Sequence, residues 1–184
     1  MLRYICLTSA LAIALIAATT SVRTQVMGAT SNSDYVAKVS TGAPAAVVKD
    51  ATIVQMSPDG TMQVLQKGTN GFTCMMVDTG TPGCADQNAM AWIKALMTHA
   101  QPPTSVGFMY MLGGDAGASN TDPYATVQTA SNHWVKTGPH VMIFGPTVKA
   151  MGYPMTTDPD PTKPYVMWPN SPYAHLMIPV TVQH

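Results

Sequence analysis

Glutamate is absent from this chain of 184 residues, and charge of either sign is scarce. Only 10 % of the residues are charged, and nine basic side chains balance nine acidic ones, all of which are aspartates. Without glutamate the chain cannot contain a His-Glu-x-x-His zinc-protease motif. Because no run of like charge exists, neither nucleic acid nor an anionic membrane surface is an expected partner.

The amino-terminal residues have the pattern of a secretory signal peptide. Arg3 supplies a positive charge, a mostly apolar run follows from Leu7 to Ala18, and small residues then offer cleavage points up to Ser21. A retained membrane anchor is the weaker alternative, because a spanning helix needs about 20 apolar residues. We therefore expect a signal peptide over residues 1–20 and an exported protein, periplasmic or extracellular, with no membrane association after cleavage.

Cleavage leaves enough chain for one domain of ordinary size. We place a flexible lead at residues 21–33, where polar and small side chains predominate, and a single globular domain at residues 34–184. Cys74 and Cys84 remain as an even pair in an oxidising compartment, separated by a short segment with glycine and proline. We predict a structural disulfide, because this is not the two-residue spacing of redox-active cysteines.

Residue patterning predicts an α+β fold with a mostly antiparallel sheet, one packed amphipathic helix and long Gly- and Pro-rich loops. A meander of three strands is expected at residues 51–56, 61–66 and 72–77, with the first two joined by a Ser-Pro-Asp-Gly turn. The amphipathic helix is expected at residues 86–99, with Asp86 as its cap. Its apolar face comprises Ala89, Met90, Ile93, Leu96 and Met97.

Two apolar segments near the carboxyl terminus each carry a histidine and a methionine two residues apart. They contain His140 with Met142 and His175 with Met177. Residues i and i+2 of a strand face the same side, so two neighbouring strands would present four imidazole and thioether groups together. These groups are copper ligands, and thioethers favour Cu(I). Copper binding is one hypothesis; the alternative is that both strands are covered on both faces and the histidines are hydrogen-bonded core residues.

A second hypothesis is hydrolysis by a histidine acting with an aspartate and a serine. The Gly-, Asn- and Asp-rich segment after residue 112 supplies the loop candidates Asp115, Ser119, Asn120 and Asp122. In this arrangement one of the two strand histidines is the base, a loop aspartate orients it, and Ser119 is the nucleophile. The chain has no Gly-x-Ser-x-Gly elbow, and the same loop residues are typical turn formers.

A third hypothesis is that the protein is a binding module, because aromatic residues gather among the prolines and loops of the second half. The candidates for a binding cleft are Trp134, Tyr165, Trp168 and Tyr173. Aromatic side chains with a polar group line clefts and interfaces, although they also fill ordinary cores. We place binding of a small molecule or a protein partner first among the three functions, with copper as the alternative cofactor and no other expected.

Four segments carry a resemblance to other proteins. They are Gly68-Thr69-Asn70-Gly71-Phe72-Thr73-Cys74, Ser119-Asn120-Thr121-Asp122-Pro123, Thr137-Gly138-Pro139-His140-Val141-Met142-Ile143, and Tyr165-Val166-Met167-Trp168 with Pro172-Tyr173-Ala174-His175. From about Pro44 onward the chain resembles an uncharacterised family of exported bacterial proteins. The resemblance implies an exported single domain, and it implies no catalytic residues.

Overall fold

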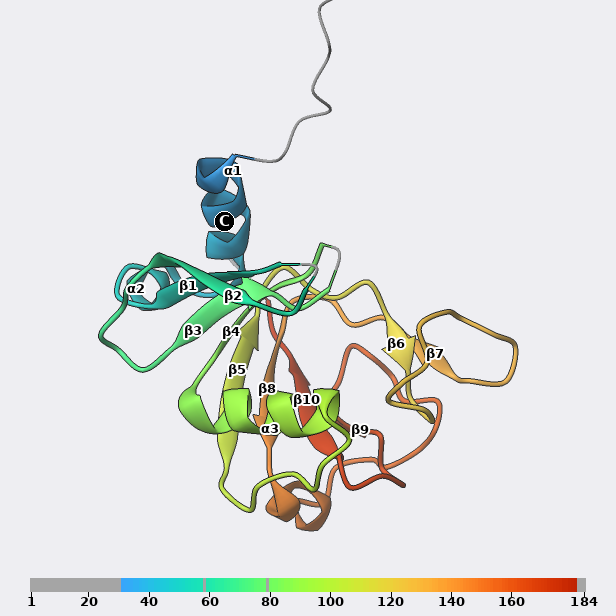
Figure 1. Ribbon diagram of the computed structural model, residues 1–184. Helices are drawn as coiled ribbons and strands as arrows, with labels where there is room; N and C mark the ends of the chain where they lie inside the picture. Colours follow the sequence, from blue (N-terminus) through green and yellow to red (C-terminus); the bar gives the residue numbers. More distant parts are fainter. Residues whose placement is uncertain (1–30, 58, 79, 182–184) are drawn as a thin grey trace, which may run out of the picture.

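Eight strands form one sheet in the order β2-β1-β3-β4-β5-β8-β10-β9, and every neighbouring pair except β1 and β3 is antiparallel (Figure 1). The computed structural model describes residues 31–57, 59–78 and 80–181. The expected signal peptide at 1–20 and the first residues of the expected lead, 21–30, lie outside these ranges. The strands are β1 (Thr52–Met56), β2 (Met62–Gln66), β3 (Thr73–Met76), β4 (Pro82–Ala85), β5 (Gly107–Met111), β8 (His140–Phe144), β9 (Tyr165–Met167) and β10 (His175–Pro179). The predicted α+β class with a mostly antiparallel sheet is confirmed.

The remaining elements are short helices and a two-stranded ribbon. They are α1 (Asn32–Val39), η1 (Ser40–Gly42), α2 (Ala45–Val48), α3 (Gln87–Met97), η2 (Pro146–Ala150), and the strands β6 (Ala118–Ser119) and β7 (Trp134–Val135). The Ser31 side chain caps α1 by accepting the Asp34 N–H at 3.2 Å, so residues 32–33, which we assigned to the lead, are helical. Within the described ranges no helix has the length and apolar character needed to cross a membrane.

The first hairpin lies where the sequence predicts it, but the third strand is not next to the second. β1 pairs with β2 on one side and, in parallel, with β3 on the other. The predicted meander is therefore wrong. The backbone N–H groups of Thr69 and Asn70 both donate to the Asp50 carbonyl, which holds the connecting loop across the start of β1. Turn-forming residues indicate that the chain reverses there, but not on which side of β1 it continues.

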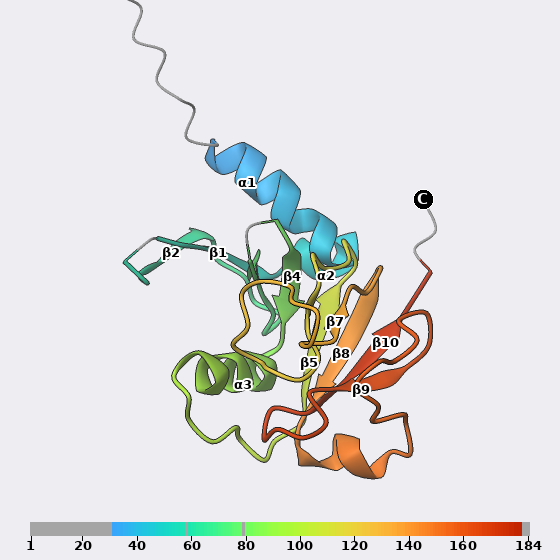
Figure 2. The same cartoon turned by 90° about the vertical axis from the view of Figure 1, so that its right-hand side faces the viewer.

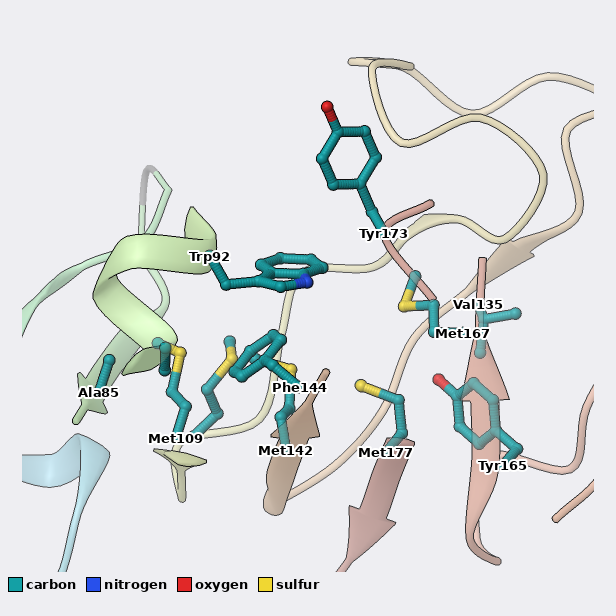
Figure 3. Close-up of a cluster of buried hydrophobic side chains, with 12 residues drawn as sticks. Ala85, Trp92, Met109, Val135, Met142, Phe144, Tyr165, Met167, Tyr173 and Met177 are labelled. Atoms are coloured by element: carbon teal, nitrogen blue, oxygen red, sulfur yellow. The ribbon is translucent and has the colours of Figure 1, made fainter. Parts of the chain in front are cut away.

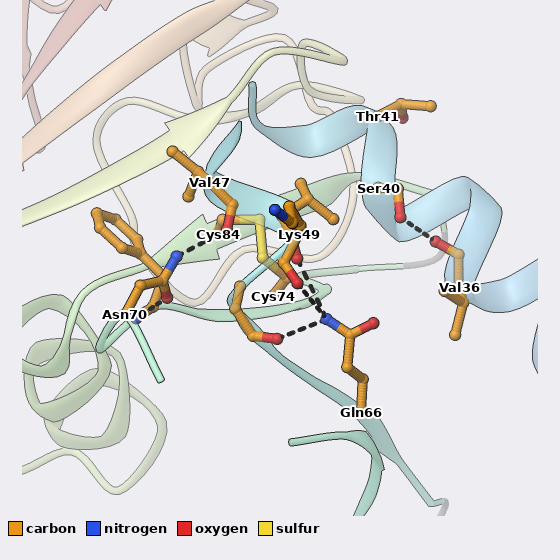
Figure 4. The surroundings of a disulfide bond; sticks show 12 residues. Val36, Ser40, Thr41, Val47, Lys49, Gln66, Asn70, Cys74 and Cys84 are labelled. Carbon is orange, nitrogen blue, oxygen red and sulfur yellow. Dashed lines mark hydrogen bonds between the residues drawn. A yellow bond between two sulfur atoms is a disulfide. The ribbon is translucent and has the colours of Figure 1, made fainter. Parts of the chain in front are cut away.

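The predicted disulfide joins Cys74 and Cys84, which are direct cross-strand neighbours in β3 and β4 (Figure 4). The sequence did not predict β4, because proline and glycine are rare inside strands. Both cysteines are buried on the face of the sheet that α1 and α2 cover. Beside them the Asn70 side chain donates to the Val47 carbonyl at 2.7 Å, so the loop after β2 and helix α2 are joined near the disulfide.

Helix α3 lies on the opposite face of the sheet. It is in front of β5, β8 and β10 in one view (Figure 1) and to one side of them in the other (Figure 2). Asp86 caps it, with Oδ1 accepting the Ala89 N–H at 2.7 Å and Oδ2 accepting the Phe108 N–H of β5 at 3.1 Å. A single carboxylate therefore satisfies the helix terminus and attaches it to the sheet.

The buried stripe of α3 is rotated from the one that the sequence predicts. Ala89, Trp92 and Ala95 are its buried residues, whereas Met97 is 59 % exposed. The prediction that Met97 faces the core is therefore wrong. The small side chains of Ala89 and Ala95 let the helix approach the sheet, and this places the large Trp92 ring between the two layers.

Gly107 permits the closest contact between α3 and β5. A methyl group at this position would overlap the Ala89 nitrogen and would lie 2.7 Å from Ala89 Cα. Because the helix backbone would have to move, Gly107→Ala is expected to lower the free energy of unfolding by about 2 kcal/mol, as measured by urea denaturation. Gly138→Ala is the control, because a methyl group there meets nothing within 4 Å. Equal stability of the two variants would contradict this close contact.

Candidate functional site

A cavity of about 290 Å³ lies between α3 and the sheet. Its floor comprises residues of β5, β8, β10 and β9: Met109, Met111, His140, Met142, Phe144, His175, Met177 and Met167. Helix α3 contributes Trp92, Ile93, Leu96 and Met97, and the loops and ribbon contribute Val77, Asp78, Asp115, Gly117, Ala118 and Trp168. Figure 3 shows the labelled methionines of the floor rising from the strands toward the layer that holds Trp92.

The strand register arranges the floor in rows that cross the sheet. Met109, Met142 and Met177 form the central row, since each is the direct partner of the next on β5, β8 and β10. Met111 and His140 are partners in the row on one side of it, two residues along the strands. In the row on the other side, His175 is the partner of Phe144 on β8 and of Met167 on β9. Alternate residues of these strands face away from the cavity, so the floor consists almost entirely of thioether, imidazole and aromatic groups.

His140 is fully buried at the edge of this floor. Its Nδ1 is 2.7 Å from the Gly138 carbonyl oxygen, and since a carbonyl can only accept, Nδ1 carries the proton. Nε2 then carries the lone pair, and it has no hydrogen-bond partner among the described residues. Burial lowers the pKa of His140, and the Gly138 carbonyl and the Asp115 carboxylate offset this only in part. The ring is therefore neutral at pH 7, with an unsatisfied acceptor in an otherwise apolar site.

His175 has the same tautomer in a more aromatic environment. Its Nδ1 donates to the Tyr173 carbonyl at 3.0 Å. The imidazole centroid lies 4.9 Å from that of Trp168 and 5.3 Å from those of Trp92 and Phe144. Burial lowers the pKa of His175 to about 4. Both histidines of the floor are thus neutral donors to backbone carbonyls.

The charge at the cavity is negative. Asp115 is half-buried, and its Oδ1 accepts backbone N–H groups from Gly117 at 2.9 Å and Thr137 at 3.0 Å. Burial raises the pKa of Asp115 although these two hydrogen bonds oppose the shift. Asp78 is a second carboxylate at the cavity and is exposed. Because neither lysine nor arginine is found among the described lining residues, the site disfavours an anionic ligand.

Comparison of the chain with protein-family models, curated proteins and solved structures found no match. A functional assignment therefore depends on the geometry and chemistry of this cavity.

The His-Met hypothesis required β8 and β10 to be neighbours, and they are. All four of its residues line the cavity, but the antiparallel register separates the histidines. His140 is opposite Pro179 and His175 is opposite Phe144, an offset of four residues or about 13 Å along a strand. Only Met142 and Met177 are direct partners, so the four groups are spread over the floor instead of converging on one point.

Ser119, the nucleophile of the hydrolase hypothesis, is buried in the ribbon of β6 and β7. Its hydroxyl donates to the Asn132 carbonyl at 2.7 Å and accepts the backbone N–H groups of Thr121 at 3.2 Å and Asp122 at 2.9 Å. Every hydrogen bond of this hydroxyl within the described residues is to its own loop. The pairing of a serine with an imidazole base is therefore not assembled here.

The other loop candidates also hold backbone in place. Asn120 is buried, and its Nδ2 donates to the carbonyls of Thr156 and Thr157 at 3.0 Å each, while its Oδ1 accepts the Trp168 N–H at 3.0 Å. It therefore joins the ribbon to the segment before β9. Asp122 is exposed and accepts the backbone N–H two residues further on, as expected for a turn former.

The four aromatic candidates do not form one cleft. Trp168 lines the cavity, and its ring is parallel to that of Trp92 with centroids 6.2 Å apart. Tyr165 and Tyr173 are core residues whose hydroxyls bond to a threonine hydroxyl and to a backbone carbonyl, each at 2.8 Å. Trp134 packs against Gly117, which directly precedes β6, and it is not among the cavity residues.

Sequence reasoning did not assign several residues of the floor and of helix α3 to the site. They are Met109, Met111, Met167, Trp92 and Phe144. Met109 and Met111 alternate within residues 106–112, an apolar run that fits a strand or a helix from sequence alone. Their alternation with Tyr110 was the one available signal, because residues two apart share a face if the run is a strand.

Proposed function

We propose that the protein is an exported binding module that holds a small ligand in the cavity between α3 and the sheet. One observation carries the proposal: His140 lines the cavity, and its Nε2 atom is buried without a partner in the described structure. A buried polar atom left unsatisfied costs about 1–3 kcal/mol, so a ligand that donates to this nitrogen or coordinates it would remove that penalty. The free energy recovered contributes directly to affinity.

The lining indicates the kind of ligand. The volume is near the lower end of small-molecule sites, and the walls are mainly apolar with a few polar groups, as is usual for such sites. The carboxylates of Asp78 and Asp115 favour a positively charged ligand. A binding role is preferred to hydrolysis, because the Ser119 hydroxyl is engaged by its own loop.

Export is supported independently of the cavity. The amino-terminal residues have the charge and apolar pattern of a signal peptide. The Cys74–Cys84 disulfide suits an oxidising compartment such as the periplasm or the cell exterior. The resemblance to exported bacterial proteins agrees with both observations.

A thermal-shift screen of the mature protein tests the binding role. Small organic molecules, with and without a positive charge, and metal salts are the compounds to be screened. A ligand at 100 times its Kd should add about 2.7 kcal/mol, which corresponds to a rise in Tm of several degrees for a domain of this size.

Ala118→Trp is the variant that tests the location, because Ala118 lines the cavity and a large side chain there fills it. Ala130→Trp, at an exposed loop position, is the matched control. We expect stabilisation of the wild type and of the control but not of Ala118→Trp. A ligand that stabilises all three proteins equally, or a screen without any stabilising compound, would overturn the proposal.

A further inference from the structure

Four residues of β5 and β8 form a compact block on the cavity floor. Met109 is the direct partner of Met142, and Met111 is the direct partner of His140. All four line the cavity, and none is more than 8 % exposed. Three thioethers and one imidazole therefore project from two adjacent strands into the same space.

The spacing of this block suits a single bound ion. Cross-strand partners are separated by about 5 Å and residues i and i+2 by about 7 Å, so the four Cα atoms outline a small rectangle. A methionine side chain is long, unbranched and flexible, which lets its sulfur move toward a shared point above the centre. The Met109 methyl group lies against Gly83 of β4, on the side of β5 away from β8, so this flexible side chain has to change rotamer to bring its sulfur to the shared point.

His140 has the arrangement of a prepared metal ligand. Metal-bound histidines usually donate the other ring N–H to a carbonyl or carboxylate, which fixes the tautomer and the orientation of the ring. The Gly138 carbonyl accepts from His140 Nδ1 in this way, and Nε2 is left without a partner in the described residues.

We infer that the cavity binds a soft monovalent metal ion, Cu(I), through His140 Nε2 and the thioethers of Met109, Met111 and Met142. This inference rests on the proposed function, whose ligand it names. Thioether with imidazole is a donor set that selects Cu(I), while Zn²⁺ prefers thiolate, imidazole and carboxylate together, and Mg²⁺ and Ca²⁺ prefer oxygen. Within the described ranges there is no group of three or more His, Cys, Asp or Glu residues that could hold a metal ion.

The charge of the site is consistent with a cation of this type. His140 and the three methionines are neutral ligands, so the bound ion keeps its positive charge in a buried position. The carboxylates of Asp78 and Asp115 line the same cavity. A nearby carboxylate lowers the cost of burying a single positive charge.

Anaerobic titration with Cu(I) in competition with a chromophoric Cu(I) chelator tests the inference. The variants are Met109→Leu, Met111→Leu and Met142→Leu, because leucine conserves volume and removes the sulfur. Met167→Leu and Met177→Leu are matched controls, since both residues line the same cavity but lie outside the block. We expect one Cu(I) per protein, a loss of about tenfold or more in each block variant, and less than about threefold in each control.

X-ray absorption of the Cu(I) complex provides a readout that a merely structural role would not change. Sulfur scatterers together with one nitrogen scatterer are expected, and each block variant should lose sulfur. An absence of Cu(I) binding, equal affinities in block and control variants, or a shell of nitrogen and oxygen alone would overturn the inference. If Cu(I) fails to bind while an organic compound stabilises the wild type but not Ala118→Trp, the proposed function stands and only the identity of the ligand falls.

Discussion

Replacement of Trp92 by alanine is expected to lower the free energy of unfolding by about 3–5 kcal/mol, the range for truncation of a large buried aromatic residue. Trp92 is 3 % exposed. Its ring centroid is 4.5 Å from that of Phe144 on the sheet and 5.8 Å from that of Tyr173. These contacts attach α3 to the cavity floor and to the loop before β10, so their loss removes apolar burial and leaves a void.

Urea denaturation at pH 7 measures the effect of Trp92→Ala, and Met97→Ala on the same helix is its control. Met97 is more than half exposed, so its truncation should change stability by no more than about 0.5 kcal/mol. The sequence pattern places Met97 on the apolar face, so the sequence alone predicts a substantial loss from Met97→Ala as well. A larger loss from Met97→Ala than from Trp92→Ala would show that the helix is rotated from the orientation described.

Acidification from pH 7 to pH 5 is expected to remove about 2 kcal/mol of stability through His175 alone. Its pKa is about 4 in the folded protein, because the ring is buried, and near 6.5 when the chain is unfolded. Between these two values the unfolded state binds more protons than the native state, so stability falls as the pH falls. The loss begins near pH 6.5 and is complete below about pH 4. The lowered pKa of His140 contributes with the same sign.

His175→Asn isolates this contribution, because the amide nitrogen of asparagine can replace Nδ1 as the donor to the Tyr173 carbonyl and does not titrate. Urea denaturation of both proteins at pH 7 and pH 5 gives the comparison. Asp115 acts with the opposite sign, since its raised pKa makes the folded protein bind a proton more readily than the unfolded chain does. The difference between the two proteins removes that common background. An equal loss of stability in both would contradict the assignment to His175.

The spacing of residues a few positions apart was sufficient to predict several features of this protein. The hairpin of β1 and β2 follows from alternation around a Pro-Asp-Gly turn, and α3 begins where Asp86 was expected to cap it. The disulfide follows from an even cysteine pair with a short flexible segment between. The two apolar His-Met segments are strands, as expected. In each case the deciding interactions are local or require only that two residues share a face.

The lining of the cavity depended on contacts that residue spacing cannot specify. An alternating strand determines which side chains face together, but not which strand lies beside it or at what offset. Register separated His140 from His175, and β5 placed Met109 and Met111 beside His140 and Met142. Gly107 brought α3 close enough for Trp92 to cover them, because packing between distant segments selects the helix face that fits. The sequence by itself determined which side chains share a face of each strand, and only the tertiary structure determined which of them meet across the sheet, because strand order and register depend on contacts between distant segments.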